Sequence, residues 1–319
     1  MDYSTIKNTD IKITRIGFGC SNFGGIGSDL RLVGKGDSED DAHKILDAVY
    51  DLGINYYDTA TTYGNGKSEE ILGNWIKKNT LSRKDVFISS KVSKKSEVFP
   101  WNRKGLSKKH ILKQIEASLK RLQLDYLDIF YIHAPDPATP IVEILGALDE
   151  CVRKGLSKAI GISNVTLEYL KESVETSKKK SWSEYAVVQN SYNYLKRNDD
   201  NDVIPFCKEN GILYIGYEPL AGGILTGKYQ KGREYPENTR LHLRESLYRK
   251  YLTQENFQKI DELNEIAVKR NVKLPVFMYE WLYKNENIDS FLIGPRNTEQ
   301  FQSVRDALEM IMKENVLSR

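Results

Sequence analysis

Short apolar runs alternate with longer amphipathic segments along most of the chain. The short runs are rich in Ile, Val, Leu and Tyr, as is typical of buried strands, while the segments between them repeat apolar residues at the spacing of one helix face. The pattern predicts strands at 15–19, 54–57, 86–90, 126–132, 158–162, 185–188, 213–216 and 290–293. It predicts helices at 38–52, with Ser38 as the cap, and at 68–78, 107–122, 141–154, 167–177, 202–210, 255–270, 275–283 and 298–313.

This alternation of strand and helix predicts an α/β fold, a (β/α)8 TIM barrel in which a single domain spans residues 1–319. A short hairpin at 6–13 precedes the barrel, and a long polar loop at 227–251 follows the seventh strand. The alternative is a doubly wound open sheet. No Gly-x-Gly-x-x-Gly follows a strand, so the usual dinucleotide-binding fingerprint of such sheets is missing.

Polar side chains stand where one predicted strand after another ends. Active sites of TIM barrels lie at the carboxyl ends of the strands. Any one of these residues could be structural, and a lone histidine is more often a packed one. Their recurrence nevertheless predicts a shared pocket. The residues, in strand order from the second to the eighth, are Asp58, Lys91, His133, Ser163 with Asn164, Gln189 with Asn190, Tyr217, and Gly294 to Arg296.

Composition narrows the possible partners. The net charge of +3 is too small to favour nucleic-acid or membrane binding, and no apolar run approaches the ~20 residues of a membrane span. The N-terminal residues are polar and lack the apolar core of a signal peptide. Cys20, Cys151 and Cys207 have no metal-ligand spacing and cannot all pair, which favours a reducing cytoplasm and no metal. Nothing in the pattern indicates an oligomeric state.

The strand-end residues, together with Tyr63 in the loop after Asp58, suggest proton transfer to a carbonyl. A phenol has a pKa of about 10 and donates protons poorly near neutrality. We expect the ammonium of Lys91, held by Asp58, to lower the pKa of Tyr63, so that Tyr63 serves as general acid or base while His133 orients the same oxygen. No Gly-x-Ser-x-Gly elbow is present. The natural companion of such an acid is a hydride donor, which requires a cofactor.

At these residues the chain resembles the aldo-keto reductase family. The resemblance extends from about Ile11 to Ala307, and its most specific segments are 53–64 (GINYYDTATTYG), 127–133 (LDIFYIH), 161–164 (GISN) and 217–229 (YEPLAGGILTGKY). It implies an oxidoreductase that interconverts an aldehyde, ketone or sugar-type carbonyl and its alcohol, with NADPH preferred over NADH. It also implies the catalytic set Asp58, Tyr63, Lys91 and His133. The third and fourth segments are similar to the bacterial and potassium-channel β-subunit branch.

The resemblance also implies residues that bind the cofactor. Ser163, Asn164 and Gln189 would hold the nicotinamide amide, and Tyr217 would stack on its ring. The 2′-phosphate of the adenosine would meet Lys228 and Arg240. The further positions that would line the cofactor are Gly19, Cys20, Pro219, Leu220, Gly222, Gly294, Arg296 and Gln300.

The sequence departs from the family pattern at three places. Arg296 stands where Ser or Thr is frequent, and a guanidinium suits a phosphate, which favours NADPH. Ser303 and Val304 replace a Glu-Asn pair that holds the adenine in the family. Glu218 replaces a serine, and the sequence does not indicate what this changes.

The substrate is not determined by these motifs. Candidate specificity loops are 24–37, 92–105 with Phe99 and Trp101, and the segment with Tyr192 and Tyr194; these aromatic residues either form a substrate wall or pack their own loops. A cofactor-binding regulatory or redox-sensing subunit with slow turnover is the alternative function. An aldolase with Lys91 as a Schiff base is disfavoured, because pairing with Asp58 would keep the amine protonated.

Overall fold

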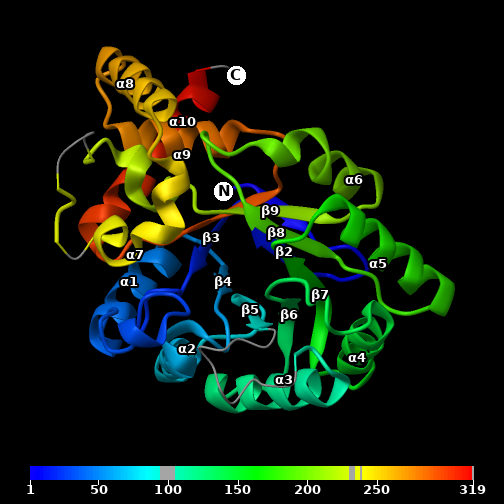
Figure 1. Ribbon diagram of the computed structural model, residues 1–319. Coiled ribbons are helices and arrows are strands. Elements are labelled where there is room, and N and C mark those ends of the chain that lie inside the picture. Colours follow the sequence, from blue (N-terminus) through cyan, green and yellow to red (C-terminus); the bar gives the residue numbers. More distant parts are fainter. Residues whose placement is uncertain (94–104, 230–233, 238, 318–319) are drawn as a thin grey trace.

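The computed structural model describes residues 1–93, 105–229, 234–237 and 239–317 of the chain. Its centre is a closed barrel of parallel strands in the order β10-β3-β4-β5-β6-β7-β8-β9, which confirms the predicted TIM barrel (Figure 1). The strands are β3 (Ile16–Gly19), β4 (Tyr56–Asp58), β5 (Phe87–Val92), β6 (Leu127–Ile132), β7 (Ser157–Ser163), β8 (Val187–Ser191), β9 (Leu213–Tyr217) and β10 (Ser290–Ile293).

Helices surround the barrel (Figure 1). They are α1 (Glu39–Asp51), α2 (Lys67–Lys78), α3 (Lys108–Leu122), α4 (Ile141–Arg153), α5 (Leu167–Lys180), α6 (Val203–Glu209), α7 (Arg240–Tyr248), α8 (Gln254–Lys269), α9 (Leu274–Lys284) and α10 (Thr298–Leu317). The apolar faces of most of them pack on the outward-facing strand residues in one large core, while α7 and α8 pack with the segment 221–229 and part of α9 in a second cluster. Ser38 caps α1 as predicted, because its hydroxyl accepts a hydrogen bond from the N–H of Asp41.

Two tyrosines fill the barrel interior where neighbouring strands carry glycine. A Cβ at Gly17 would lie 2.5 Å from the ring of Tyr56, and one at Gly161 would lie 2.4 Å from the ring of Tyr131. The glycines therefore leave the room that these rings need. The hydroxyls of Tyr56 and Tyr131 are 3.2 Å apart in this interior.

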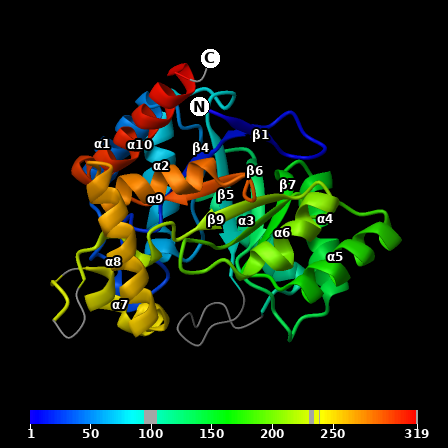
Figure 2. The ribbon, with the colours of Figure 1, turned by 90° about the horizontal axis from the view of Figure 1, so that it is seen from above.

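The N-terminal hairpin covers one end of the barrel. Its strands, β1 (Tyr3–Thr5) and β2 (Lys12–Thr14), are antiparallel. Ile6, Ile11 and Ile13 join the cluster of interior strand residues. Figure 2 shows β1 and α7 at opposite ends of the barrel. The carboxyl ends of the strands are therefore left open on the side of α7.

Details of the prediction differ from the structure at the hairpin, at the cap of α3 and in the segment 227–251. The hairpin strands lie outside 6–11, which forms their connection. Ser107 is the N-cap residue of α3, but its side chain makes no capping hydrogen bond, and the N–H of Lys108 donates to the carboxylate of Glu143. The segment 227–251 is not a loop throughout, because α7 and the short helix η5 (Arg249–Tyr251) lie within it. Thr239 caps α7, whose buried residues are Leu241 and Tyr248. Two apolar positions were too few to reveal a helix by periodicity.

Candidate active site

A cavity of about 700 Å³ opens at the carboxyl ends of the barrel strands. Of the side chains predicted to be catalytic, Asp58, Tyr63 and His133 line it, and Lys91 lies fully buried beneath it. All predicted cofactor positions except the buried Cys20 line it too: Gly19, Ser163, Asn164, Gln189, Tyr217, Pro219, Leu220, Gly222, Lys228, Arg240, Gly294, Arg296 and Gln300. The fold thus brings together residues that are far apart in the sequence.

Asp58 and Lys91 form an ion pair in the floor of this cavity. Asp58 ends β4, and Lys91 lies on the neighbouring β5. The carboxylate also accepts hydrogen bonds from Ser89 at 2.6 Å and from Gln189 at 3.1 Å. The ammonium donates a second bond to the carbonyl of Thr59 at 3.0 Å. Burial lowers the pKa of Lys91, and the charge of Asp58 opposes that decrease.

Tyr63 begins a tight turn, the helix η2 (Tyr63–Gly66), directly above this pair. Gly64 and Asn65 have φ of 53° and 59°, left-handed values that the turn requires. The ammonium of Lys91 is 5.1 Å from the centre of the Tyr63 ring. Burial, followed by the charge of Asp58, raises the pKa of Tyr63. The expectation that Lys91 would lower this pKa was therefore wrong, because it considered neighbouring charge and not burial.

The imidazole of His133 lies beside Tyr63. Their rings meet edge to face, with 5.5 Å between centroids. The Nδ1 atom of His133 is 3.0 Å from the hydroxyl of Ser93, a residue that the sequence did not single out. Burial, with the charge of Lys91, lowers the pKa of His133 to about 3. The ring is therefore neutral at physiological pH.

The predicted nicotinamide residues form a connected group next to His133. The amide of Asn164 donates to the backbone carbonyl of His133 at 2.8 Å, and its oxygen accepts from the hydroxyl of Tyr217 at 2.5 Å. Asn164 has a φ of 57°, which fixes its amide at the end of β7. Gln189 uses its amide nitrogen to bind Asp58 and so joins this group to the ion pair.

The wall of the cavity is rich in cations. The side chain of Arg296 donates from Nε to the carboxylate of Asp37 at 2.8 Å, and its backbone N–H donates to the side-chain oxygen of Gln300 at 3.0 Å. Arg240 donates to Asn22 at 3.0 Å. Cationic side chains that line the cavity are Lys228, Arg240, Arg244, Lys250 and Arg296, against the acids Asp58 and Glu218. Such a donor set fits a ligand that carries several negative charges.

The short helix η4 (Ala221–Thr226) supplies a glycine cradle at the cavity wall. Gly222 and Gly223 have φ of 70° and 98°, and a Cβ at Gly222 would lie 2.4 Å from the ring of Tyr248. The positive φ values and the ring of Tyr248 against Gly222 explain why these positions are glycine. The structure also shows where the residues that depart from the family pattern lie. Ser303 lines the cavity and Val304 is buried in the core, while Glu218 accepts a hydrogen bond from Ser191 at 2.9 Å.

Several lining residues were missed by the sequence reasoning. They come mainly from α7 and its surroundings, which no motif marked: Ser21, Thr239, Arg244, Leu247, Tyr248 and Lys250. Gly27 and Ser28, which also line the cavity, lie in the loop 24–37 that was predicted as a candidate specificity loop. The sequence pattern did not predict α7, which lies in the segment expected to be a loop. A helix predicted at this position would have placed its arginines over the strand ends.

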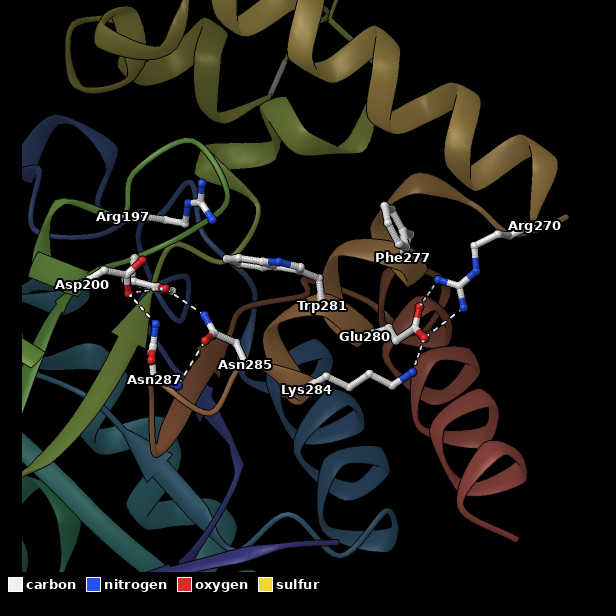
Figure 3. Close-up of a pocket in the computed structure, with 10 residues that line it drawn as sticks. Arg197, Asp200, Arg270, Phe277, Glu280, Trp281, Lys284, Asn285 and Asn287 are labelled. Atoms are coloured by element: carbon white, nitrogen blue, oxygen red, sulfur yellow. Dashed lines mark hydrogen bonds and ion pairs between the residues drawn. The ribbon is translucent and has the colours of Figure 1, made fainter. Parts of the chain in front are cut away.

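Tyr192 and Tyr194 pack against Trp281 of α9 and do not line the cavity at the strand ends. The ring of Tyr192 is stacked on Trp281 at 6.2 Å, and Tyr194 meets the same indole edge to face. Tyr192 and Trp281 line a second hollow, of about 410 Å³, on the flank of the barrel beside α9. Figure 3 shows Trp281 there between Arg197 and Phe277, with Glu280 bridging Arg270 and Lys284. Phe99 and Trp101 lie outside the described residues.

Other kinds of site are not found in the described part of the chain. It contains no cluster of three metal-ligating side chains and no helix long and apolar enough to cross a membrane. Cys20, Cys151 and Cys207 are all buried, free thiols.

Comparison with known proteins agrees with this geometry. Residues 15–319 match the model of the aldo/keto reductase family. A protein of Arabidopsis thaliana named "Probable voltage-gated potassium channel subunit beta" is 31% identical, over 98% of this chain and 92% of its own. The L-glyceraldehyde 3-phosphate reductase of Escherichia coli is 34% identical, over 83% of this chain and 78% of its own. An aldo-keto reductase of Fusarium vanettenii is 31% identical over 87% and 79%.

Proposed function

The chain belongs to the aldo/keto reductase family of oxidoreductases, which act on carbonyls with a nicotinamide cofactor, and from this premise we propose a specific catalytic arrangement. The protein interconverts an aldehyde, ketone or sugar-type carbonyl and its alcohol with NADPH. Tyr63 is the general acid in reduction and the general base in oxidation. Lys91, Asp58 and His133 assist it.

The observation that carries this proposal is the arrangement around Tyr63. Its ring lies 5.1 Å from the ammonium of Lys91 and 5.5 Å from the imidazole of His133, in a cavity lined by cations. The phenol of Tyr63, the ammonium of Lys91 and the neutral imidazole of His133 thus lie close together at one place in the cavity. A carbonyl oxygen bound there would meet all the groups that its reduction requires.

The raised pKa of Tyr63 supports its role as a donor. The phenol holds its proton at neutral pH, so it is in the form that a developing alkoxide needs. As the proton leaves, the phenolate that forms is stabilised by the nearby ammonium of Lys91. Asp58, Ser89 and Gln189 fix that ammonium in place through the carboxylate.

His133 orients the substrate oxygen. Since Ser93 occupies Nδ1, the other ring nitrogen is the one that can bind a ligand. A neutral imidazole can donate this hydrogen bond without competing with Tyr63 for the proton. His133 therefore polarises and positions the carbonyl, and Tyr63 protonates it.

The cofactor, when bound, supplies or accepts the hydride. Asn164, Ser163 and Gln189 would hold the nicotinamide, with Tyr217 against its ring, and the glycine cradle of η4 would take the pyrophosphate. Arg296, Lys228 and Arg240 would bind the 2′-phosphate. The Nε atom of Arg296 is held by Asp37, which leaves its terminal amino groups available for the paired contacts that a phosphate accepts.

A second function is supported by one comparison. Similarity over 98% of this chain to the Arabidopsis protein named as a channel subunit favours a regulatory subunit that binds cofactor and turns over slowly. The complete catalytic group favours the enzyme. The three buried thiols agree with a reducing compartment, so we place the protein in the cytoplasm.

The test is NADPH oxidation against a panel of aldehydes, ketones and sugars, with product alcohols identified. The panel includes glyceraldehyde 3-phosphate, because the similar Escherichia coli protein is named for its L form. Turnover that Tyr63→Phe abolishes is the expected result. Tight NADPH binding without turnover of any carbonyl would favour the regulatory subunit and contradict the enzyme.

A further inference from the structure

Arg244 is a cation in the candidate active site that has no hydrogen-bond or ion-pair partner in the described part of the chain. It lies on α7, at a point where the backbone leaves helical geometry, with φ of −142° and ψ of 41°. Its side chain lines the cavity. Within the described residues, no hydrogen bond or ion pair joins its guanidinium to another side chain. A partly buried guanidinium is rarely left without an acceptor unless a ligand provides one.

The guanidinium reaches the loop between β3 and α1. A Cβ at Gly27 would lie 2.3 Å from Nη1 of Arg244, so the side chain rests directly on this glycine. Gly27 has a φ of 61°, a second reason for glycine at this position. The loop and α7 therefore meet across the cavity through Arg244.

This contact lies close to the turn that carries Tyr63, where the carbonyl of the substrate would bind. The carbonyl of Gly27 accepts a hydrogen bond from the N–H of Gly64, the residue after Tyr63, at 3.2 Å. The next residue, Ser28, is hydrogen-bonded to Thr62 at 2.7 Å. Arg244 thus rests on the segment that holds the turn of the proposed acid.

Electrostatics agree with this location. Burial and Asp58 raise the pKa of Tyr63, and the first charge that acts against them is Arg244, followed by Arg240. The carboxylate of Asp29 is also within the field of Arg244, but it is already bound by both Nε and Nη2 of Arg31. Among the described residues, the charge of Arg244 is therefore not neutralised by a dedicated partner.

We propose that Arg244 binds an anionic group of the substrate, so that this enzyme prefers carbonyl compounds that carry a phosphate or carboxylate a few bonds from the reacting carbon. The inference rests on the proposed function, which supplies the carbonyl reduction. A phosphate or carboxylate accepts paired hydrogen bonds from one guanidinium. Such a contact would fix the substrate relative to Tyr63 and raise kcat/KM for anionic members of a substrate series.

The experiment compares matched pairs of substrates with NADPH. Suitable pairs are glyceraldehyde 3-phosphate with glyceraldehyde, and 4-carboxybenzaldehyde with benzaldehyde. Each pair is measured with the wild type, with Arg244→Gln and with Arg249→Gln. Arg249 is an exposed arginine paired with Glu245, so its variant changes net charge equally. The dissociation constant of NADPH is measured for each protein.

We expect Arg244→Gln to lower kcat/KM for the anionic member of each pair by about tenfold or more, the size of one charge-assisted bond. The neutral member and the NADPH dissociation constant should change by no more than about threefold, below the loss of one ordinary hydrogen bond. Arg249→Gln should match the wild type.

Other outcomes separate this inference from the function on which it rests. Equal losses for both members together with weaker NADPH binding would assign Arg244 to the cofactor phosphates and overturn the proposal. Unchanged selectivity would also overturn it, while leaving the reductase intact. A wild type that reduces no member of any pair would remove the proposed function and this inference together.

Discussion

The ammonium of Lys91 and the carboxylate of Asp58 form an ion pair in which Lys91 is fully buried and Asp58 is 2% exposed. Each charge has further partners, since Ser89 and Gln189 donate to the carboxylate and Thr59 accepts from the ammonium. A buried pair is costly to desolvate, and replacing one by apolar residues is often neutral. Its retention beneath Tyr63 is therefore better explained by function than by stability.

The first prediction is a stability cycle at this pair. Asp58→Asn places an amide against three donors, and Lys91→Met leaves a buried carboxylate without its cation. Each single change should lower the free energy of unfolding by about 3–5 kcal/mol, because an unpaired buried charge or donor remains. The double variant should lose at least about 1 kcal/mol less than the sum of the two. Urea unfolding measures all four proteins.

Additive losses would contradict the cycle, since they would mean that the two groups do not interact. All three variants should also lose carbonyl reduction. Because activity and unfolding are measured on the same samples, an inactive but stable protein can be distinguished from an unfolded one.

The barrel and the strand-end residues could be predicted from the sequence because short apolar runs alternate with amphipathic segments. This alternation locates both the strands and the points where they end. Asp58, His133 and Tyr217 follow from that pattern alone. Arg244 and Ser93 do not, since each reaches the site from a segment with little apolar periodicity. The aromatic residue Tyr192 was an open alternative because composition does not indicate the face on which a ring packs. Burial around Tyr63 was likewise invisible in a one-dimensional pattern.

The second prediction concerns pH and His133. Burial lowers its pKa from 6.5 to about 3, so the unfolded chain binds more protons at this site within that window. Stability should therefore decrease as the pH falls below 6.5, and the decrease should be smaller in His133→Asn. The melting temperature of both proteins, measured from about pH 7 to about pH 4, tests the difference.

The pH dependence of turnover is a second test of the protonation state of His133. With a neutral imidazole and a protonated phenol, kcat/KM for carbonyl reduction should be flat between about pH 5 and about pH 8. A step near the ordinary pKa of histidine, present in the wild type and absent in His133→Asn, would show that His133 titrates as an ordinary histidine.

The third prediction concerns the choice of cofactor. Combining Arg296→Ala with Lys228→Ala should weaken NADPH binding by about 100-fold or more, because two charge-assisted phosphate contacts are lost. NADH, which lacks the 2′-phosphate, should change only a few fold. Titration calorimetry with both cofactors measures the ratio, and Lys313→Ala on the exposed side of α10 is the control. Equal losses for the two cofactors would mean that the 2′-phosphate is bound elsewhere.

The most direct test of the central claim is the rate of carbonyl reduction by Tyr63→Phe, measured with saturating NADPH on protein whose NADPH dissociation constant is determined in the same preparation. The change removes one oxygen and leaves the ring between Lys91 and His133. We predict a loss of about 100-fold to 10,000-fold in kcat, the usual contribution of a general acid, with NADPH affinity within a few fold of the wild type. Turnover within about tenfold of the wild type would contradict the assignment of Tyr63 as the proton donor.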